Sequence, residues 1–277
     1  MLRSILTFIV TLFLSVLAGA QPIKVLFVGN SFTYEPGDMS NPALPDNFKA
    51  IALSLNIDVQ VDYVVKGGQT LKRHFDEGEV YKKLSSNKYS YVIVQAQSIE
   101  ALELPKCFPD NGGPVGRPEF LKYAEKLIAL IEANGAIPVI FAHWTYKKDH
   151  PWLQDNFPCL KFANNEVNAG KNWFGSNLIE YQKMLNEGFA MAAVSSPNTI
   201  QSFVGSKWLE LMNNKPRNIP DTDLYQDDNL HPTVLGSFFS AMVLARDIFK
   251  VDVNLLTKHP DQITENQFVL MKSVLTK

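Results

Sequence analysis

The segment IKVLFVGNSF spans residues 23–32 and sets a pattern that the rest of the chain repeats. Its first six residues are almost wholly apolar and include β-branched and aromatic side chains, and Gly29 ends the run. A short run of this kind is typical of a strand buried on both faces of a parallel sheet. Asn30 and Ser31 follow directly, at the carboxyl edge where such a sheet carries its functional groups.

Similar apolar runs recur along the chain, and segments with helical periodicity lie between them. This alternation predicts an α/β domain, a three-layer sandwich in which about five parallel strands are covered by helices on both faces. Besides the first, the predicted strands are 59–65, 91–94, 137–142 and 189–194. The predicted helices are 45–55, 71–84, 118–134, 175–186, 234–249 and 262–275.

Residues 1–20 differ in character from the rest of the chain. One basic residue, Arg3, precedes a long apolar run that ends in Ala18-Gly19-Ala20. This pattern predicts a secretory signal peptide cleaved after Ala20, and hence a periplasmic or secreted protein. The alternative is a retained membrane anchor, because the run is nearly long enough to span a bilayer. The small residues before the cleavage point favour the signal peptide.

Residues 21–277 are expected to form a single domain without a further membrane span. The chain is 46% hydrophobic and 19% charged, so it can bury a core without disulfides or metals, and no linker or repeat divides it. The formal net charge is −2, and no dense cluster of Lys and Arg is present. These features argue against a nucleic-acid partner. No Cys/His cluster has zinc spacing, and we expect neither a metal nor a cofactor.

The chain has two cysteines, Cys107 and Cys159, both in segments that contain proline. After export they would meet an oxidising compartment, where a disulfide between them can form. The alternative is that both remain unpaired and act as small hydrophobic residues. Separation in sequence says nothing about separation in space, so both alternatives stay open.

Two segments at opposite ends of the chain carry candidate catalytic residues. Ser31 follows the first strand, where backbone N–H groups can receive a developing oxyanion. Asp228 and His231 precede the helix predicted at 234–249. A serine hydroxyl needs an adjacent base to become a nucleophile, and that base needs a carboxylate to orient it. Asp228 and His231 can fill both roles from one loop.

Each of these residues also has a purely structural interpretation. Serines after strands commonly cap helices or close turns, and Asp and His both favour turns at helix starts. Asp227 is a second carboxylate beside Asp228. The local patterns alone therefore do not establish a catalytic triad.

Taken together in chain order, the motifs resemble the conserved blocks of the SGNH (GDSL-like) hydrolases. Gly29-Asn30-Ser31-Phe32 is similar to the first block, with Asn30 in place of the family's Asp, and Asp228-x-x-His231 is similar to the last. The glycine block is similar to Gly67-Gly68-Gln69-Thr70. The first block looks most like that of an exported bacterial subgroup that also carries Gln-x-Gln-Ser as its third block.

The third block of the family normally reads Gly-x-Asn-Asp, and here Gln95-Ala96-Gln97-Ser98 stands at that place. The resemblance implies an oxyanion hole made of the backbone N–H groups of Ser31 and Gly68 and the side chain of Gln97. It further implies a flavodoxin-like sandwich, no metal, and hydrolysis of small acyl esters, often acetyl groups on carbohydrates.

Aromatic residues near the same sheet edge, with Tyr34 and Trp144 foremost, are candidates for stacking on a sugar ring. The alternative is that they pack beneath neighbouring segments, as most loop aromatics do.

Two rival functions stay open at this point. A doubly wound sheet can bind a flavin or nucleotide at the same edge, although the loop at residues 29–34 matches neither a P-loop nor a dinucleotide fingerprint. A non-catalytic SGNH-like domain would bind a glycan or a partner without turning it over. The sequence identifies neither the acyl group, the alcohol nor the oligomeric state.

Overall fold

The computed structural model of the protein describes residues 21–34, 43–103, 116–147, 150, 178–213 and 224–276. Within these residues, five parallel strands form one sheet in the order β2-β1-β3-β4-β5. The predicted α/β class is confirmed. The expected signal peptide, Cys107 and Cys159 lie outside the described residues. The strands are β1 (Ile23–Gly29), β2 (Val59–Val65), β3 (Tyr91–Val94), β4 (Ile137–Phe141) and β5 (Ile200–Ser202).

The strand order is that of flavodoxin-like sheets, as expected. From β1 the chain passes to β2 on one side, and it then returns to form β3 on the other side of β1. Because the two crossovers run in opposite directions, the carboxyl ends of β1 and β3 form the switch point at which sheets of this kind place their ligand sites. The loop after β1 begins at that switch point.

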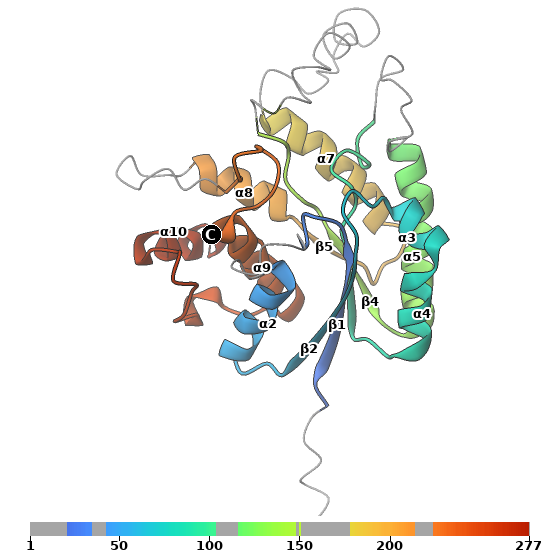
Figure 1. The fold of residues 1–277 in the computed structure, drawn as a ribbon, viewed down its shortest axis with the longest axis horizontal. Helices are drawn as coiled ribbons and strands as arrows, with labels where there is room; N and C mark the ends of the chain where they lie inside the picture. Colours follow the sequence, from blue (N-terminus) through green and yellow to red (C-terminus); the bar gives the residue numbers. More distant parts are fainter. Residues whose placement is uncertain are drawn as a thin grey trace, which may run out of the picture.

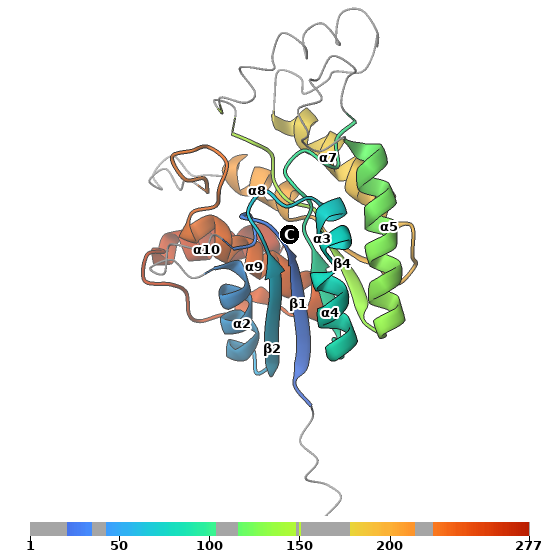
Figure 2. The ribbon, with the colours of Figure 1, turned by 45° about the vertical axis from the view of Figure 1, so that its right-hand side comes forward.

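Helices cover both faces of the sheet, as Figures 1 and 2 show. In β1, Val25 and Phe27 point into one core, whereas Leu26 and Val28 point into the other. The first core is closed by α2 (Leu44–Ser54), α8 (Val204–Asn213), α9 (Val234–Phe249) and α10 (Glu265–Leu275). The second is closed by α3 (Leu71–Glu77), α4 (Glu79–Ser86), α5 (Arg117–Asn134) and α7 (Leu178–Ala193).

The prediction of a strand at 189–194 was wrong, because residues 189–193 form the last turns of α7, which ends at Ala193. Leu185, Phe189 and Ala192 are buried at helical spacing, while Val194 is 81% exposed. A short apolar run does not by itself distinguish a strand from a buried helical segment. The fifth strand is instead Ile200–Ser202, which is only three residues long and partly polar.

The helix predicted over 71–84 is divided in two by Gly78. This glycine has φ 74°, ends α3 and precedes α4. A left-handed residue at this point is easily accepted by glycine and interrupts the hydrogen-bond ladder. Helix α8, which begins directly after β5, was not among the predicted helices.

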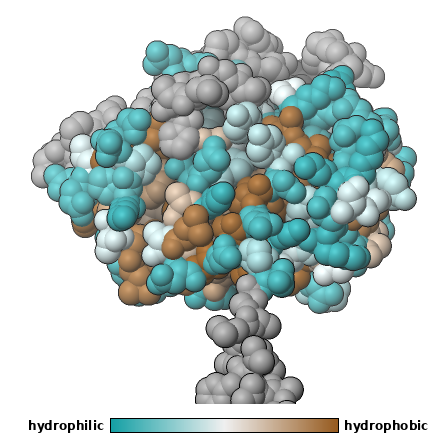
Figure 3. Space-filling view, turned by 60° about the horizontal axis from the view of Figure 1, so that its bottom comes forward, coloured by the Kyte–Doolittle hydropathy of each residue, from teal (hydrophilic) through white to brown (hydrophobic). Residues whose placement is uncertain are grey.

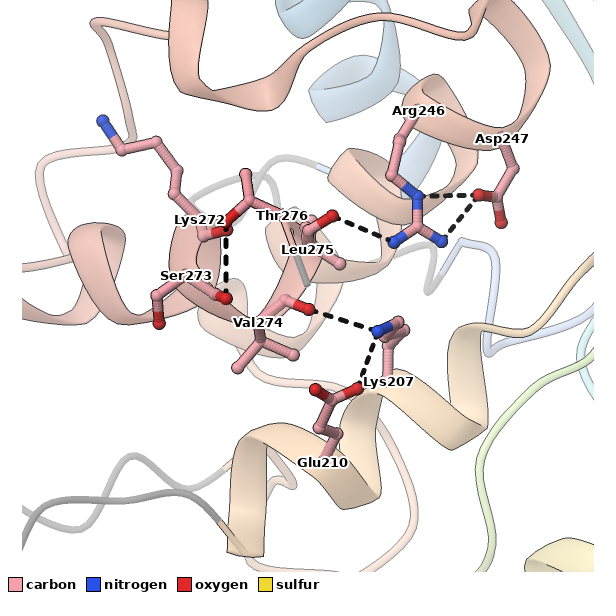
Figure 4. A network of polar contacts seen from close by, with 9 residues as sticks. All are labelled: Lys207, Glu210, Arg246, Asp247, Lys272, Ser273, Val274, Leu275 and Thr276. Carbon is pink, nitrogen blue, oxygen red and sulfur yellow. Dashed lines mark hydrogen bonds and ion pairs between the residues drawn. The ribbon is translucent and has the colours of Figure 1, made fainter.

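Cationic side chains from two helices hold the end of α10 (Figure 4). Lys207 Nζ on α8 donates to Val274 O at 3.2 Å, and Arg246 on α9 donates to Leu275 O at 3.4 Å. Positive groups at a helix C-terminus satisfy its free carbonyls and oppose its dipole. The closing helix is thereby fastened to the layer that carries α9, the helix that follows Asp228 and His231.

The edge from which the strands begin shows hydrophobic residues interspersed among hydrophilic ones (Figure 3). A hollow of about 320 Å³ lies near this edge, between the C-terminal ends of α4 and α5. Among its lining residues, Asn134 donates to the backbone oxygens of Leu84 and Asn87 and accepts from the backbone N–H of Tyr89. The side-chain amide of Asn134 is therefore already paired within the protein, and the hollow lies at the opposite edge of the sheet from Ser31.

Candidate active site

A tight turn after β1 carries Ser31, and the buried side chain of Gln95 supports it. Gln95 Oε1 accepts hydrogen bonds from the backbone N–H of Asn30 and the hydroxyl of Thr33, each at 3.0 Å. A Cβ atom at Gly29 would lie 2.8 Å from Gln95 Oε1 and 2.5 Å from Thr33 Oγ1. The glycine before the turn is therefore required by close packing against this amide.

The Asn30 side chain connects the turn to the glycine loop. It is buried, and its Oδ1 accepts from the backbone N–H of Phe32 at 3.2 Å. Its Nδ2 donates to Gln69 O, also at 3.2 Å. The residue before Ser31 is thus hydrogen bonded to the residue after Gly68. An amide can make both bonds at once because it offers a donor and an acceptor, whereas an ionised Asp offers only acceptors.

His74 holds the end of β1 from the other side. Its Nε2 donates to Gly29 O at 2.8 Å, and the side chain is 3% exposed. Burial lowers the pKa of His74 to about 4, so the ring is neutral at physiological pH and carries its proton on Nε2. His74 therefore has a structural role at the end of β1.

The loop with Asp228 and His231 is a hairpin that returns onto itself before α9. Tyr225 and Pro232 form an antiparallel bridge, and Gln226 N donates to His231 O at 2.8 Å. At the tip, Asn229 has φ 60°, a left-handed conformation that asparagine tolerates better than most residues. The bridge and this hydrogen bond fix the backbone position of His231, the residue before Pro232.

Ser31, His231 and Asp228 come together in one hydrogen-bonded chain. His231 Nε2 lies 2.8 Å from Ser31 Oγ, and His231 Nδ1 is hydrogen bonded to Asp228 Oδ2. The other carboxylate oxygen, Oδ1, accepts from the backbone N–H groups of Leu230 and His231, each at 2.9 Å. Asp228 therefore serves as a turn residue and as the partner of the imidazole at the same time.

Partial burial acts to raise the pKa of Asp228, but hydrogen bonds from the His231 ring and from the backbone of His231 and Leu230 outweigh it. The pKa lies below its usual value, so the carboxyl is ionised at neutral pH. The side chains of His231 and Asp228 are 18% and 44% exposed. The hydrogen-bonded chain is thus reachable from solvent.

The amide of Gln97 is held in one orientation by its neighbours. Its Oε1 accepts from Ile99 N at 3.0 Å, and its Nε2 donates to Ser98 Oγ at 2.8 Å. Ser98 Oγ is in turn 2.7 Å from the hydroxyl of buried Tyr146. A primary amide has two N–H groups. The second N–H of Gln97 therefore has no acceptor among the described residues.

Gly68 lies in the loop between β2 and α3 and has φ 64°. A Cβ atom there would meet no other atom within 4 Å, so the glycine is explained by its backbone conformation rather than by crowding. Among the described residues, no acceptor is hydrogen bonded to the backbone N–H of Gly68 or of Ser31.

Comparison of this arrangement with known proteins gives matches at the level of structure. No known family profile and no curated protein sequence matches the chain. A Slackia heliotrinireducens protein assigned to the SGNH hydrolases superposes with a TM-score of 0.57 at 20% identity, over 82% of this chain and all of its own. The chain has the SGNH hydrolase fold.

Two further structures share this fold. A DUF4886 family protein from Bacteroides uniformis has a TM-score of 0.62 at 14% identity, covering 92% of this chain and 93% of its own. The acetylxylan esterase Axe2 from Geobacillus stearothermophilus has a TM-score of 0.53 at 11% identity, covering 85% and 95%. At these identities the comparisons establish the SGNH hydrolase fold and not the substrate.

The two aromatic residues expected to contact a sugar take different positions on the SGNH fold. Trp144 is 1% exposed and is stacked between Phe32, at 4.8 Å, and Trp208, at 4.0 Å between ring centroids. Its burial contradicts a substrate-stacking role, and its Nε1 instead donates to Leu230 O at 3.0 Å. Tyr34 is half-buried and stacks on Tyr63, whose side chain is exposed on the edge strand β2.

Sequence reasoning assigned no role to Gln95 or Glu100, both of which are buried beside the site. The sequence signal for Gln95 was its position directly after β3, two residues before Gln97. Glu100 gave a weaker signal, because only burial makes a glutamate in a turn unusual.

The described part of this SGNH-fold chain contains no group of three or more His, Cys, Asp or Glu side chains arranged to hold a metal ion. Across the same residues, no helix is both long and apolar enough to cross a membrane.

Proposed function

We propose that this SGNH-fold protein is a serine esterase in which Ser31 is the nucleophile, His231 the general base and Asp228 the carboxylate that orients the base. The observation that carries the proposal is the 2.8 Å contact between His231 Nε2 and Ser31 Oγ, with Asp228 on the opposite ring nitrogen. Nucleophile, base and orienting group within hydrogen-bond reach of one another are the signature of an activated serine.

The reaction follows from the proton positions in this chain. A neutral His231 that donates Nδ1–H to Asp228 has a free lone pair on Nε2, which accepts the Ser31 proton as Oγ attacks the ester carbonyl. The imidazolium, stabilised by the ionised Asp228, then gives that proton to the departing alcohol. Water, deprotonated by His231 in its turn, attacks the acyl-Ser31 ester and releases the acid and the free serine.

Three donors are proposed to receive the carbonyl oxygen as it becomes negative: the backbone N–H groups of Ser31 and Gly68 and the side chain of Gln97. The unused N–H groups at all three residues support this assignment. Gln97 has one methylene more than the asparagine of the family pattern, and the hydrogen bonds from Ile99 and to Ser98 fix where its amide points.

The proposed substrates are small acyl esters, with acetyl groups on carbohydrates as the leading class. The similarity to Axe2, an acetylxylan esterase, supports this class. The side chains of His231 and Asp228 are 18% and 44% exposed, so an acyl group carried on a bulky alcohol can reach the triad from solvent.

Kinetics with para-nitrophenyl acetate test the proposal. Ser31→Ala is expected to lower kcat by roughly a million-fold, whereas Gln97→Ala is expected to lower it about a hundred- to a thousand-fold. Near-native activity of Ser31→Ala would refute the esterase mechanism, and near-native activity of Gln97→Ala alone would refute only its place in the oxyanion hole. A wild-type protein that binds acetylated glycans without hydrolysing them would indicate the non-catalytic alternative.

A further inference from the structure

Glu100 is a buried carboxyl group for which the proposed reaction has no use. It lies in the turn after β3 and is 2% exposed. Its Oε2 accepts from the backbone N–H of Gln97 at 2.7 Å. The backbone N–H of Leu71 points at both of its oxygens, 3.1 Å from Oε1 and 3.2 Å from Oε2. One side chain therefore binds the backbone of two separate loops.

These two loops carry two of the three proposed oxyanion donors. Leu71 begins α3, three residues after Gly68, and Gln97 follows β3. In the sheet, β2 and β3 flank β1 on opposite sides. Glu100 thus joins the loops on either side of β1, beside the end at which Ser31 stands.

We propose that Glu100 is a positioning residue for ester hydrolysis, which holds the loops of Gly68 and Gln97 at the spacing that the tetrahedral oxyanion requires. The inference rests on the proposed function, because it assumes that both loops bind the oxyanion. Oxyanion donors act through preorganised geometry, so a link that fixes their separation contributes to the rate without contacting the substrate.

The charge state of Glu100 agrees with this role. Burial raises its pKa to about 8, against the lowering effect of the Gln97 and Leu71 N–H groups, and Glu119 on α5 raises it further. At neutral pH the side chain is mostly uncharged. An ionised carboxylate close to the oxyanion would repel it, whereas a neutral carboxyl still accepts both N–H groups.

Two substitutions of similar volume separate the hydrogen bonds from packing. Glu100→Gln keeps an oxygen for both N–H groups, whereas Glu100→Met fills the space without an acceptor. With para-nitrophenyl acetate, we expect kcat of the Gln variant within about threefold of wild type, and kcat of the Met variant lowered roughly tenfold to a hundredfold, below the cost of losing a donor outright. KM should change less than kcat in both. Glu125, exposed on α5, supplies the matched controls Glu125→Gln and Glu125→Met.

An unchanged kcat in Glu100→Met, equal losses in the Gln and Met variants, or a loss confined to KM would each overturn the proposal while the wild-type esterase activity stands. If the wild type itself hydrolyses no ester, the proposed function fails first. Thermal melting checks that the variants fold. If Glu100→Met does not fold, Glu100→Asp replaces it, since its shorter link should draw the loops together and lower kcat about tenfold; an Asp variant with wild-type kcat overturns the proposal.

Discussion

The side-chain oxygen of Gln95 lies 3.0 Å from the backbone nitrogen of Asn30 and so fixes the residue that precedes Ser31. The same oxygen accepts from the hydroxyl of Thr33. One buried acceptor therefore holds both sides of the turn that presents the serine. The turn's shape depends on a residue 64 positions after Ser31 in the chain.

Replacement of Gln95 by leucine should destabilise the protein, because the Asn30 N–H would lose its acceptor in a buried place. The expected decrease in the free energy of unfolding is about 1–3 kcal/mol. Urea unfolding measures it, with Gln60→Leu on the exposed side of β2 as the control, for which a change within about 0.5 kcal/mol is expected. Equal stability of the two variants would contradict the role given to Gln95.

Most of the fold could be predicted from the sequence because the strands are short, buried and bounded. The runs at 59–65 and 91–94 coincide with β2 and β3. The run at 91–94 is apolar because β3 lies inside the sheet, whereas β2 is an edge strand in which Gln60 and Asp62 alternate with apolar residues. The same criterion failed at 189–194, where α7 is buried on its apolar face by α5 and the sheet. It also missed β5, whose Gln201 and Ser202 do not read as a buried strand.

At the site, the sequence could predict which residue types were available but not which of them would meet. The contact between Ser31 and His231 spans 200 residues, and only chain topology brings it about. The sequence could not show whether the side chain of Trp144 is exposed or buried. A tryptophan in a loop has the same sequence pattern whether it faces solvent or is stacked between two rings, as it is here. Glu100 could not be recognised from the sequence, because only its burial in the folded protein distinguishes it from an ordinary surface glutamate.

Asp228→Asn should abolish most of the activity while leaving the turn intact. The amide oxygen can keep the bonds from Leu230 and His231, but its NH₂ group would then face His231 Nδ1 and force the proton onto Nε2, the wrong tautomer for a base. We expect kcat to fall by about ten-thousand-fold.

Asp227→Asn supplies a matched control for this prediction, because Asp227 is exposed and lies next to Asp228. Its kcat with para-nitrophenyl acetate should stay within about twofold of wild type, as for most surface changes away from a site. The reverse result, with Asp227→Asn inactive and Asp228→Asn active, would show that Asp227, and not Asp228, is the carboxylate that orients His231.

The raised pKa of buried Glu100 should make the free energy of unfolding depend on pH. Because its pKa is about 8 in the folded protein and near 4.5 when unfolded, the unfolded chain binds fewer protons between these values. Stability from this group is complete below pH 4.5 and falls as pH rises toward 8, by at most about 1.4 kcal/mol per pH unit.

Urea unfolding of wild type and Glu100→Gln at pH 5.5, 6.5 and 7.5 checks this sign. The wild type should lose stability relative to the Gln variant as pH rises. Buried His74 and His143, both with a pKa of about 4, act in the opposite direction below pH 6.5, but they are common to both proteins and cancel in the difference. A difference that stays constant with pH would show that Glu100 is not buried in its neutral form.

The most direct test of an activated Ser31 is covalent labelling with a fluorophosphonate, followed by mass spectrometry of the modified peptide. A serine is phosphonylated only when a neighbouring base activates it. We expect one adduct per chain, located on Ser31, and loss of the adduct in both Ser31→Ala and His231→Ala. An unlabelled wild-type protein, or an adduct on Ser31 that persists at the same rate in His231→Ala, would contradict the activation of Ser31 by His231.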